Sequence, residues 1–380
     1  MAITRVKIKP ELLRWACERA WERGPEELRE KIPKLAEWIA GTQQPTLREL
    51  ERFADAARVS VGYLFLPSPP EEHVPIPDLR TMKGRGVRRP SPDLLDVLHL
   101  CQRRQDWYRE YAKQEGETPK PFFGTATLSS SIEEVAGNMR RTLEFGVEDR
   151  QDAISPDAAL KLFIEKTEDA GVLVMVSGIV GVNTSRKLDS EEFRGFALAD
   201  PIAPLVFVNG VDGKPAQMFT LAHELAHLFL GGSALSDVSI SGRTSDRTEQ
   251  WCNCVAAEFL VPLDDISSMN LRNPLEHLNE YRNRFKVSRV VILRRLFDAG
   301  IINRAEFDAT YMLVSQSKTV KPPSKGGDFY NTYFKRASKR FVKALYSDTL
   351  EGKTLYREAY GLLGVSGTTF HNIGKKASAE

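Results

Sequence analysis

Apolar residues recur every three to four positions along most of the chain, a spacing that predicts α-helices. The pattern covers short stretches within residues 1–66, a longer stretch at 93–113 and another at 156–170. It returns at Met218 and continues to the end of the chain. His99 falls on the apolar face of the 93–113 helix, so we expect its imidazole to lie in the core.

Three short apolar runs interrupt this helical pattern. They are GVLVMVSG at 171–178, FRGFALAD at 193–200 and APLVFVNG at 203–210, and each is bounded by Gly, Asp or Asn. Short apolar runs between turn-forming residues are typical of buried strands. The sequence therefore predicts an α+β fold in which a small sheet packs within a mostly helical chain.

Changes in composition divide the chain into four expected parts. In the first of these parts, residues 1–66, Thr46 directly follows Pro45 and can cap a helix whose apolar face contains Leu47, Leu50 and Phe53. Prolines cluster just after this part and indicate a connector. The expected parts are an all-helical domain at 1–66, a proline-rich and basic helical connector at 67–128, the domain with the sheet at 129–316, and a basic helical segment at 317–380.

Composition excludes several classes of protein. The 380 residues hold 53 Lys+Arg and 51 Asp+Glu, and a net charge of +2 gives no overall attraction for nucleic acid. We expect no membrane association, because no apolar run reaches 18 residues and the N-terminal residues are too polar for a signal peptide. The four cysteines form no disulfide-like framework, so we expect a cytoplasmic protein.

The chemistry is concentrated in the helix that follows the last expected strand. It contains His223-Glu224-Leu225-Ala226-His227, with Gly231-Gly232 as its stop. Histidines four positions apart lie within about 40° of each other on a helix, so both can bind one ion. Glu224 lies about 60° from His227, beside such an ion, where it can act as a general base. The pattern predicts a Zn²⁺ site with Glu224 as the catalytic residue.

A zinc site that leaves one position open for water needs a third protein ligand, and the helix beginning near residue 247 offers Glu249 and Glu258. Nine residues separate them, which places them about 180° apart on a helix, so only one can face the metal. Glu249 is the better candidate because it lies closer to the apolar stripe, and Asn253 can support it one turn later. Cys252 and Cys254 point to different sides, and we expect both to serve packing.

At this point the residues resemble the ImmA/IrrE family of zinc metallopeptidases over roughly residues 155–300. The second helix matches the family pattern at Glu249, Asn253, Ala256, Ala257, Leu260 and Pro262, and departs from it at Cys252, Val255 and Val261. The resemblance implies a zincin-like peptidase core with zinc on His223, His227 and Glu249 and with Glu224 as the base. It also implies a protein substrate, a transcriptional regulator or repressor encoded nearby, in stress response or in mobile-element or toxin–antitoxin control.

Residues 38–65 resemble an Xre/Cro-type helix-turn-helix domain, on Trp38-Ile39-Ala40-Gly41-Thr42-Gln43-Gln44-Pro45-Thr46-Leu47 and Val61-Gly62-Tyr63-Leu64-Phe65. The segment departs from that pattern between Leu28 and Trp38, where the usual turn and part of the recognition helix are missing and Pro33 occurs. Its charge is also nearly balanced, whereas a DNA-reading helix needs clustered cations. Base-specific DNA binding and a docking or dimerisation role therefore stay equally open for this domain.

Two local basic segments are the remaining candidates for nucleic-acid binding. The first lies at 80–89 and the second, with interleaved aromatic residues, at 318–343. The contact candidates are Arg85, Arg88, Arg89, Lys335, Arg336, Lys339 and Arg340. The plainer interpretation of the second segment is a solvated helix face whose apolar side packs on the body of the protein.

The sequence thus favours a zinc-dependent endopeptidase that cleaves a specific protein partner. We expect this substrate to bind as an extended strand along the sheet edge near Ala203–Asn209. The alternative is a DNA-binding regulator or antitoxin-like protein that acts by binding, with little or no proteolysis. The sequence does not indicate an oligomeric state.

Overall fold

The computed structural model describes residues 4–20, 28, 30–79, 90–236, 246–269, 272–316 and 329–379. The chain divides into two compact units. One is formed by Met1–Pro75 with Arg89–Asp96, and the other by Ile76–Arg88 with Val97–Glu380. The boundaries of the four parts expected from the sequence stay predictions.

The first unit is helical in its described residues. Thr46 caps α4 as expected, because its hydroxyl accepts from the Glu49 amide while the Glu49 carboxylate accepts from the Thr46 amide. Leu50 and Phe53 are buried in this unit, but Leu47 is exposed. The elements are α1 (Pro10–Arg19), α3 (Leu35–Ala40), α4 (Leu47–Ala57) and the 3₁₀ helix η2 (Val61–Phe65).

The second unit combines the sheet with most of the helices. The helices of its first half are α5 (Pro92–Gln114, of which the residues up to Asp96 belong to the first unit), α6 (Ile132–Leu143), α7 (Val147–Gln151), α8 (Pro156–Asp169) and α9 (Lys214–Leu230). Those of the second half are α10 (Arg247–Leu260), α11 (Leu263–Ser268), α12 (Leu278–Phe285), α13 (Arg289–Asp298), α14 (Arg304–Gln316), α15 (Phe329–Ala337), α16 (Lys339–Leu350), α17 (Tyr356–Leu363) and α18 (Gly367–Ala379).

The main sheet has the order β1-β5-β4-β6. The three apolar runs predicted as strands form β1 (Leu173–Ser177), β4 (Gly195–Leu198) and β5 (Leu205–Asn209), so the α+β prediction is confirmed. β5 pairs in parallel with β1 and antiparallel with β4. It is therefore an interior strand, and the predicted substrate edge near Ala203–Asn209 is wrong, because both sides of β5 are already paired.

The free side of β4 is covered by a strand that the sequence pattern did not indicate. This is β6 (Ala234–Ser236), which pairs antiparallel with β4 and forms the end of the sheet. A separate two-stranded sheet consists of β2 (Ile179–Val180) and β3 (Asn183–Lys187). The edge nearest to the HExxH helix thus belongs to β6.

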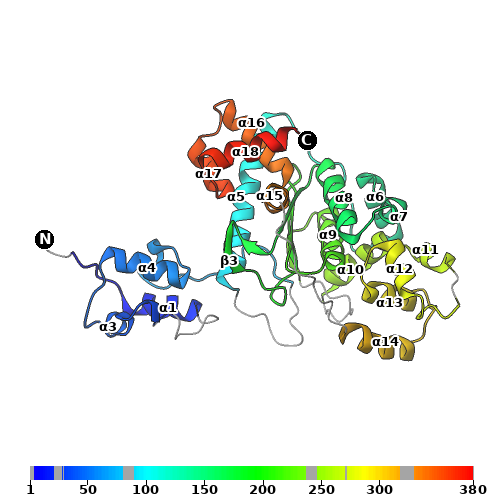
Figure 1. Ribbon diagram of the computed structural model, residues 1–380, viewed down its shortest axis with the longest axis horizontal. Coiled ribbons are helices and arrows are strands. Elements are labelled where there is room, and N and C mark those ends of the chain that lie inside the picture. Colours follow the sequence, from blue (N-terminus) through cyan, green and yellow to red (C-terminus); the bar gives the residue numbers. More distant parts are fainter. Residues whose placement is uncertain are drawn as a thin grey trace. The chain divides into compact units, whose positions relative to one another are not determined.

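Helices cover both faces of the main sheet. Alternate residues of its strands point to opposite faces, and Val174, Val206 and Val208 join a large apolar cluster with residues of α8 and α9. Met175 and Phe207 point the other way, where Met175 contacts side chains of α5. Figure 1 shows α8 and α9 on one side of the sheet and α5 and α15 on the other. Burial on both faces explains why these strands are continuous apolar runs.

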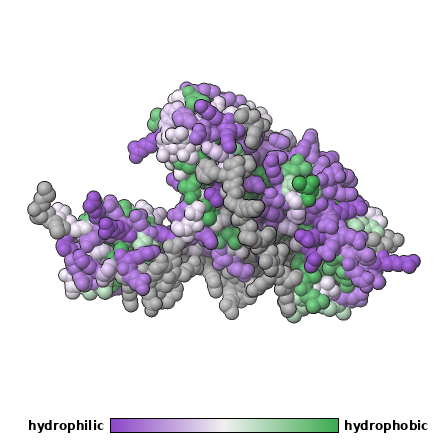
Figure 2. Space-filling model, viewed as in Figure 1, coloured by the Kyte–Doolittle hydropathy of each residue, from purple (hydrophilic) through white to green (hydrophobic). Residues whose placement is uncertain are grey.

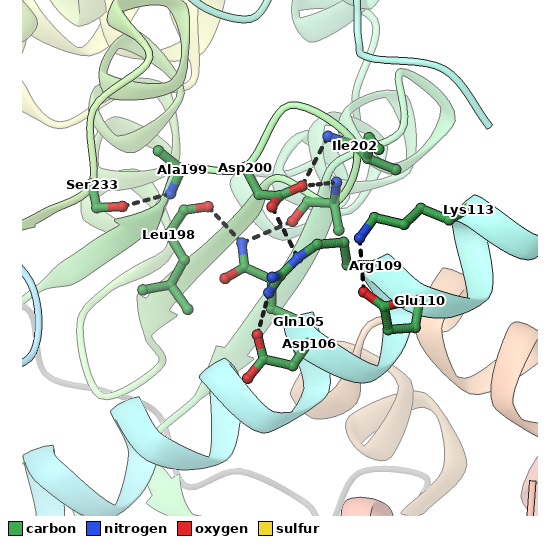
Figure 3. Close-up of polar contacts among 11 residues, drawn as sticks. Gln105, Asp106, Arg109, Glu110, Lys113, Leu198, Ala199, Asp200, Ile202 and Ser233 are labelled. Atoms are coloured by element: carbon green, nitrogen blue, oxygen red, sulfur yellow. Dashed lines mark hydrogen bonds and ion pairs between the residues drawn. The ribbon is translucent and has the colours of Figure 1, made fainter.

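Helix α5 holds the turn between β4 and β5 through polar contacts (Figure 3). The buried amide of Gln105 donates to the carbonyls of Leu198 and Ala203, at 2.9 and 2.8 Å. Asp200 shapes the same turn by accepting from two backbone amides, and Arg109 forms an ion pair with it at 3.0 Å. These contacts fix the strand pair that lies under the HExxH helix.

The C-terminal helices are attached to this body by buried polar side chains. Arg104 of α5 is buried, and its guanidinium donates to the carbonyls of Leu362 at 2.9 Å and of Arg336 at 3.2 Å. The Trp107 indole donates to Thr354 Oγ1, and the Tyr333 hydroxyl donates to the Leu363 carbonyl. Helices α15 to α18 therefore pack as part of the second unit.

The surface is mainly hydrophilic on the face drawn in Figure 2, with separate small hydrophobic patches. The side chain of His99 is exposed, so the expectation that it lies in the core is wrong. The inward side of α5 is formed by neighbours such as Leu98 and Cys101, which leaves His99 directed outward. No helix within the described ranges is both long and apolar enough to cross a membrane.

Candidate metal centre

Helix α9 carries the HExxH sequence through the middle of the apolar core. All residues from Gln217 to Phe229 are buried, and Gly231 ends the helix in the left-handed conformation at φ 74°. His223 and Glu224 are fully buried and His227 is 1% exposed. Burial of three polar side chains is costly unless they find partners, so this region needs a compensating group.

Helix α10 brings Glu249 to the two histidines. Its first turn is held by Asp246, whose carboxylate accepts from the amides of Thr248 and Glu249. Glu249 Oε1 lies 3.1 Å from His227 Nε2, and Glu249 Oε2 lies 3.4 Å from His223 Nε2. The two Nε2 atoms are 3.2 Å apart. The structure thus gathers the three expected ligand residues into one buried group.

These separations fit a tetrahedral metal site. Two ligand atoms that each lie about 2.1 Å from a tetrahedrally bound zinc ion are about 3.4 Å apart. The two Nε2 atoms, 3.2 Å apart, and the pair of His227 Nε2 with Glu249 Oε1, at 3.1 Å, are close to that spacing, and one ligand atom of each residue lies within 4.8 Å of the others. The donor set, two imidazoles and one carboxylate, is the set that zinc takes in several hydrolytic sites.

Asn253 orients the first histidine. Its Oδ1 atom lies 3.1 Å from His223 Nδ1, and a carbonyl oxygen can only accept, so the Nδ1 atom carries the proton. The Nε2 atom of His223 consequently presents a lone pair to the centre of the group, as a metal ligand must. Asn253 therefore supports His223, whereas the sequence suggested support for Glu249.

The charge states of the other two residues of this group also suit a cation. Burial lowers the pKa of His227, which favours the neutral imidazole that binds metals. Burial alone would raise the pKa of Glu249, but the two nearby imidazoles outweigh it and hold that pKa below its usual range. A neutral His227 and an ionised Glu249 are the forms that coordinate a divalent ion.

Glu224 lies beside the group and is incompletely satisfied. Burial and, second, the nearby Glu249 carboxylate raise the pKa of Glu224 well above its usual value. Its Oε1 atom is buried and has no hydrogen-bond partner. A methyl group at Gly195 of β4 would come within 2.9 Å of this oxygen, so the absence of a side chain there makes room for the carboxylate. An unpartnered buried carboxyl oxygen suits a group that takes up a proton.

The structure adds Ser236 of β6, which the sequence analysis missed. Its hydroxyl oxygen lies 3.3 Å from Glu249 Oε1, 3.4 Å from His227 Nε2 and 3.5 Å from Glu224 Oε2. The residue is fully buried. A three-residue strand such as β6 is too short to show an alternating pattern of apolar and polar residues. The only sequence signal for β6 was its position just after the Gly231-Gly232 helix stop.

Glu258, the other carboxylate considered as a ligand, faces away from this group. It forms a buried ion pair with Arg295 of α13, and its Oε2 atom also accepts from the amide of Leu263. The two glutamates of α10 therefore have separate environments, as their nine-residue spacing predicts.

Residues 167–297 match the family model described as the IrrE N-terminal-like domain, which is a peptidase family. The site resembles an IrrE-type peptidase domain. A second match, at residues 337–376, is to a domain of unknown function, DUF8813. No curated protein matches the chain. The IrrE-like segment includes every residue of the His223, His227 and Glu249 group.

The cysteines of the IrrE-like segment differ from each other. Cys252 is buried and packs in the core of α10, as expected, and burial raises the pKa of its thiol. Cys254 is exposed, so the expectation that it also serves packing is wrong. The turn of about 200° between positions i and i+2 explains the difference.

The predicted nucleic-acid contacts lie outside the IrrE-like segment. Arg85, Arg88 and Arg89 fall outside the described residues. Arg340 donates to the Tyr108 hydroxyl and to Glu117, and Lys335 lies 3.8 Å from Asp157.

The other two predicted nucleic-acid contacts of the second basic segment, Arg336 and Lys339, are half-buried. The interleaved Tyr333, Phe334 and Phe341 are buried and cannot stack on bases. Nucleic-acid binding by these cations stays a prediction.

Proposed function

We propose that this protein is a zinc-dependent endopeptidase whose metal is held by His223, His227 and Glu249. The observation that carries the proposal is the buried grouping of these three side chains, with ligand atoms within 4.8 Å of one another, beside a buried Glu224 carboxyl with an unpartnered oxygen. The match of residues 167–297 to an IrrE-type peptidase domain supports it.

A bound zinc ion would supply Lewis acidity for the scissile carbonyl and would acidify a water molecule. The chain's own residues perform the remaining tasks. Asn253 fixes the tautomer of His223, and the buried apolar wall of α9 excludes bulk water from the reacting groups. Glu224 accepts the proton of the attacking water at its unpartnered Oε1 atom and returns it to the leaving amine.

The position of Ser236 supports peptide binding along β6. This strand ends the sheet and brings the Ser236 hydroxyl to the ligand group, so an extended polypeptide beside β6 would pass the site. Main-chain pairing of this kind binds extended segments with little regard for their side chains. We propose a protein substrate bound in this way, and the resemblance noted above favours a transcriptional regulator.

The experiment compares wild type with Glu224→Gln for metal content and for cleavage of proteins that co-purify with them. We expect stoichiometric zinc in both proteins and cleavage by wild type alone. Wild type without stoichiometric metal would overturn the zinc site, and cleavage by the variant would remove Glu224 from its role. The alternative, regulation by binding alone, predicts that Glu224→Gln retains the full biological effect.

A further inference from the structure

The outer edge of β6 is already occupied by a segment of the same unit. The Leu235 amide donates to the Pro77 carbonyl at 2.9 Å, and the Leu79 amide donates to the Leu235 carbonyl at 3.0 Å. Asp78 thereby forms a parallel bridge with Leu235. Residues 77–79 of the proline-rich connector thus lie along the end of the sheet as a short added strand.

This pairing uses the outward-facing backbone groups at the centre of β6. Gly195, Phe196 and Ala197 of β4 lie opposite Ser236, Leu235 and Ala234 in the antiparallel register. Backbone groups of successive residues in a strand point to alternate sides, so those of Leu235 face away from β4. Any polypeptide that adds to this edge needs the same N–H and C=O groups, and its binding excludes residues 77–79.

The occupied position is also next to the metal centre. Ser236 directly follows Leu235, and its hydroxyl contacts His227, Glu249 and Glu224. A strand paired at Leu235 is therefore one residue from the reacting groups. The edge that serves a substrate and the edge that holds residues 77–79 are the same edge.

We propose that residues 77–79 act as an internal competitor that keeps the substrate edge of β6 closed to other polypeptides until they are displaced. This inference rests on the proposed peptidase function and adds its regulation. The attachment is suited to displacement, because its backbone pairing with β6 comprises two hydrogen bonds among the described residues and Pro77 has no N–H with which to extend it. As part of the same chain the segment competes at high effective concentration, so free peptides compete poorly.

The test removes one of the two hydrogen bonds and measures access to the edge. Leu79→Pro deletes the amide that donates to Leu235, whereas Leu79→Ala keeps this amide and removes only the side chain. The probe is the fluorescein-labelled peptide VPIPDL, the sequence of residues 74–79, followed by fluorescence anisotropy. We expect a Kd at least tenfold lower for Leu79→Pro than for wild type, with Leu79→Ala equal to wild type. Equal affinity for all three proteins, or no binding to any, would overturn the proposal.

A second measurement separates this proposal from the peptidase function. Zinc-loaded wild type and Leu79→Pro are compared for hydrolysis of fluorescently labelled casein, with Leu79→Pro/Glu224→Gln as the inactive control. We expect hydrolysis at least tenfold faster by Leu79→Pro. If no protein hydrolyses casein but the difference in peptide affinity remains, the competitor is supported and the peptidase function fails. Equal hydrolysis by wild type and Leu79→Pro contradicts the competitor and leaves the peptidase intact.

Discussion

Replacing Glu249 by Gln will weaken zinc binding, whereas replacing Glu258 by Gln on the same helix will weaken folding instead. Glu249 lies 3.1 and 3.4 Å from the two imidazoles, and Glu258 pairs with Arg295. The two side chains are similarly buried, at 1% and 5% exposed, so the expected difference comes from their partners and not from burial.

The expected changes in zinc affinity and in the free energy of unfolding follow from the contact that each substitution removes. Changes outside the ligand shell of a metal site cost about 10- to 100-fold in affinity, so loss of the Glu249 carboxylate should cost at least about 100-fold. Glu258→Gln removes the closer of the two carboxylates that pair with the Arg295 guanidinium, which is 4% exposed, and leaves only Asp298 at 3.7 Å. Breaking a buried ion pair in this way costs about 3–5 kcal/mol, and the amide of Gln should keep the loss near the lower figure.

Two assays read these effects independently. Competition with a chromophoric chelator gives the zinc affinity, and urea unfolding in the presence of excess chelator gives the free energy of unfolding without metal. The reasoning is refuted if Glu258→Gln weakens zinc binding more than Glu249→Gln does. An unchanged free energy of unfolding for Glu258→Gln would separately show that its pair with Arg295 contributes nothing.

Three further changes test the surroundings of the site and the C-terminal attachment. Gly195→Ala places a methyl group 2.6 Å from Thr220 and 2.9 Å from Glu224 Oε1, so it should cost about 1–3 kcal/mol in urea unfolding, whereas Gly232→Ala, which meets open space, should not. Asn253→Ala releases the His223 tautomer and should lower zinc affinity about 10- to 100-fold in the chelator assay. Burial raises the pKa of Glu168 from 4.5 to about 7, so the native state holds this proton more tightly than the unfolded chain does. The stability that Glu168 contributes is therefore complete at low pH and is lost as the pH rises from about 4.5 to about 7. Glu168→Gln should flatten this pH dependence, and an identical profile for both proteins would contradict the assignment.

The grouping of His223, His227 and Glu249 could be predicted because most of its geometry is local. His223, Glu224 and His227 occupy one helix face at any overall fold, and helical geometry alone separated Glu249 from Glu258. The strands β1, β4 and β5 could be predicted equally well, because strands that are buried on both faces have uninterrupted apolar sequences.

The order of the strands could not be predicted, and the substrate edge was misplaced for that reason. Whether β5 lies inside or at the end of a sheet depends on its partners, and β6 joins only after the intervening helix α9. The same limit applies to Ser236 and to the pairing of Leu235 with residues 77–79, which join distant parts of the chain. His99 was misjudged because the side of α5 that faces the sheet is decided by tertiary packing.

The buried guanidinium of Arg104 has a consequence for how genes encoding this protein can change. Its hydrogen bonds to the C-terminal helices end on the main-chain carbonyls of Arg336 and Leu362, so they do not depend on the side chains at those positions but require the backbone itself. Recombination that exchanged the last helices for an unrelated sequence would strand a cation in the interior unless Arg104 changed with them. A substitution at Leu362 that keeps the backbone therefore leaves this hydrogen bond in place, whereas truncation ahead of α17 removes one of the two carbonyls that Arg104 binds.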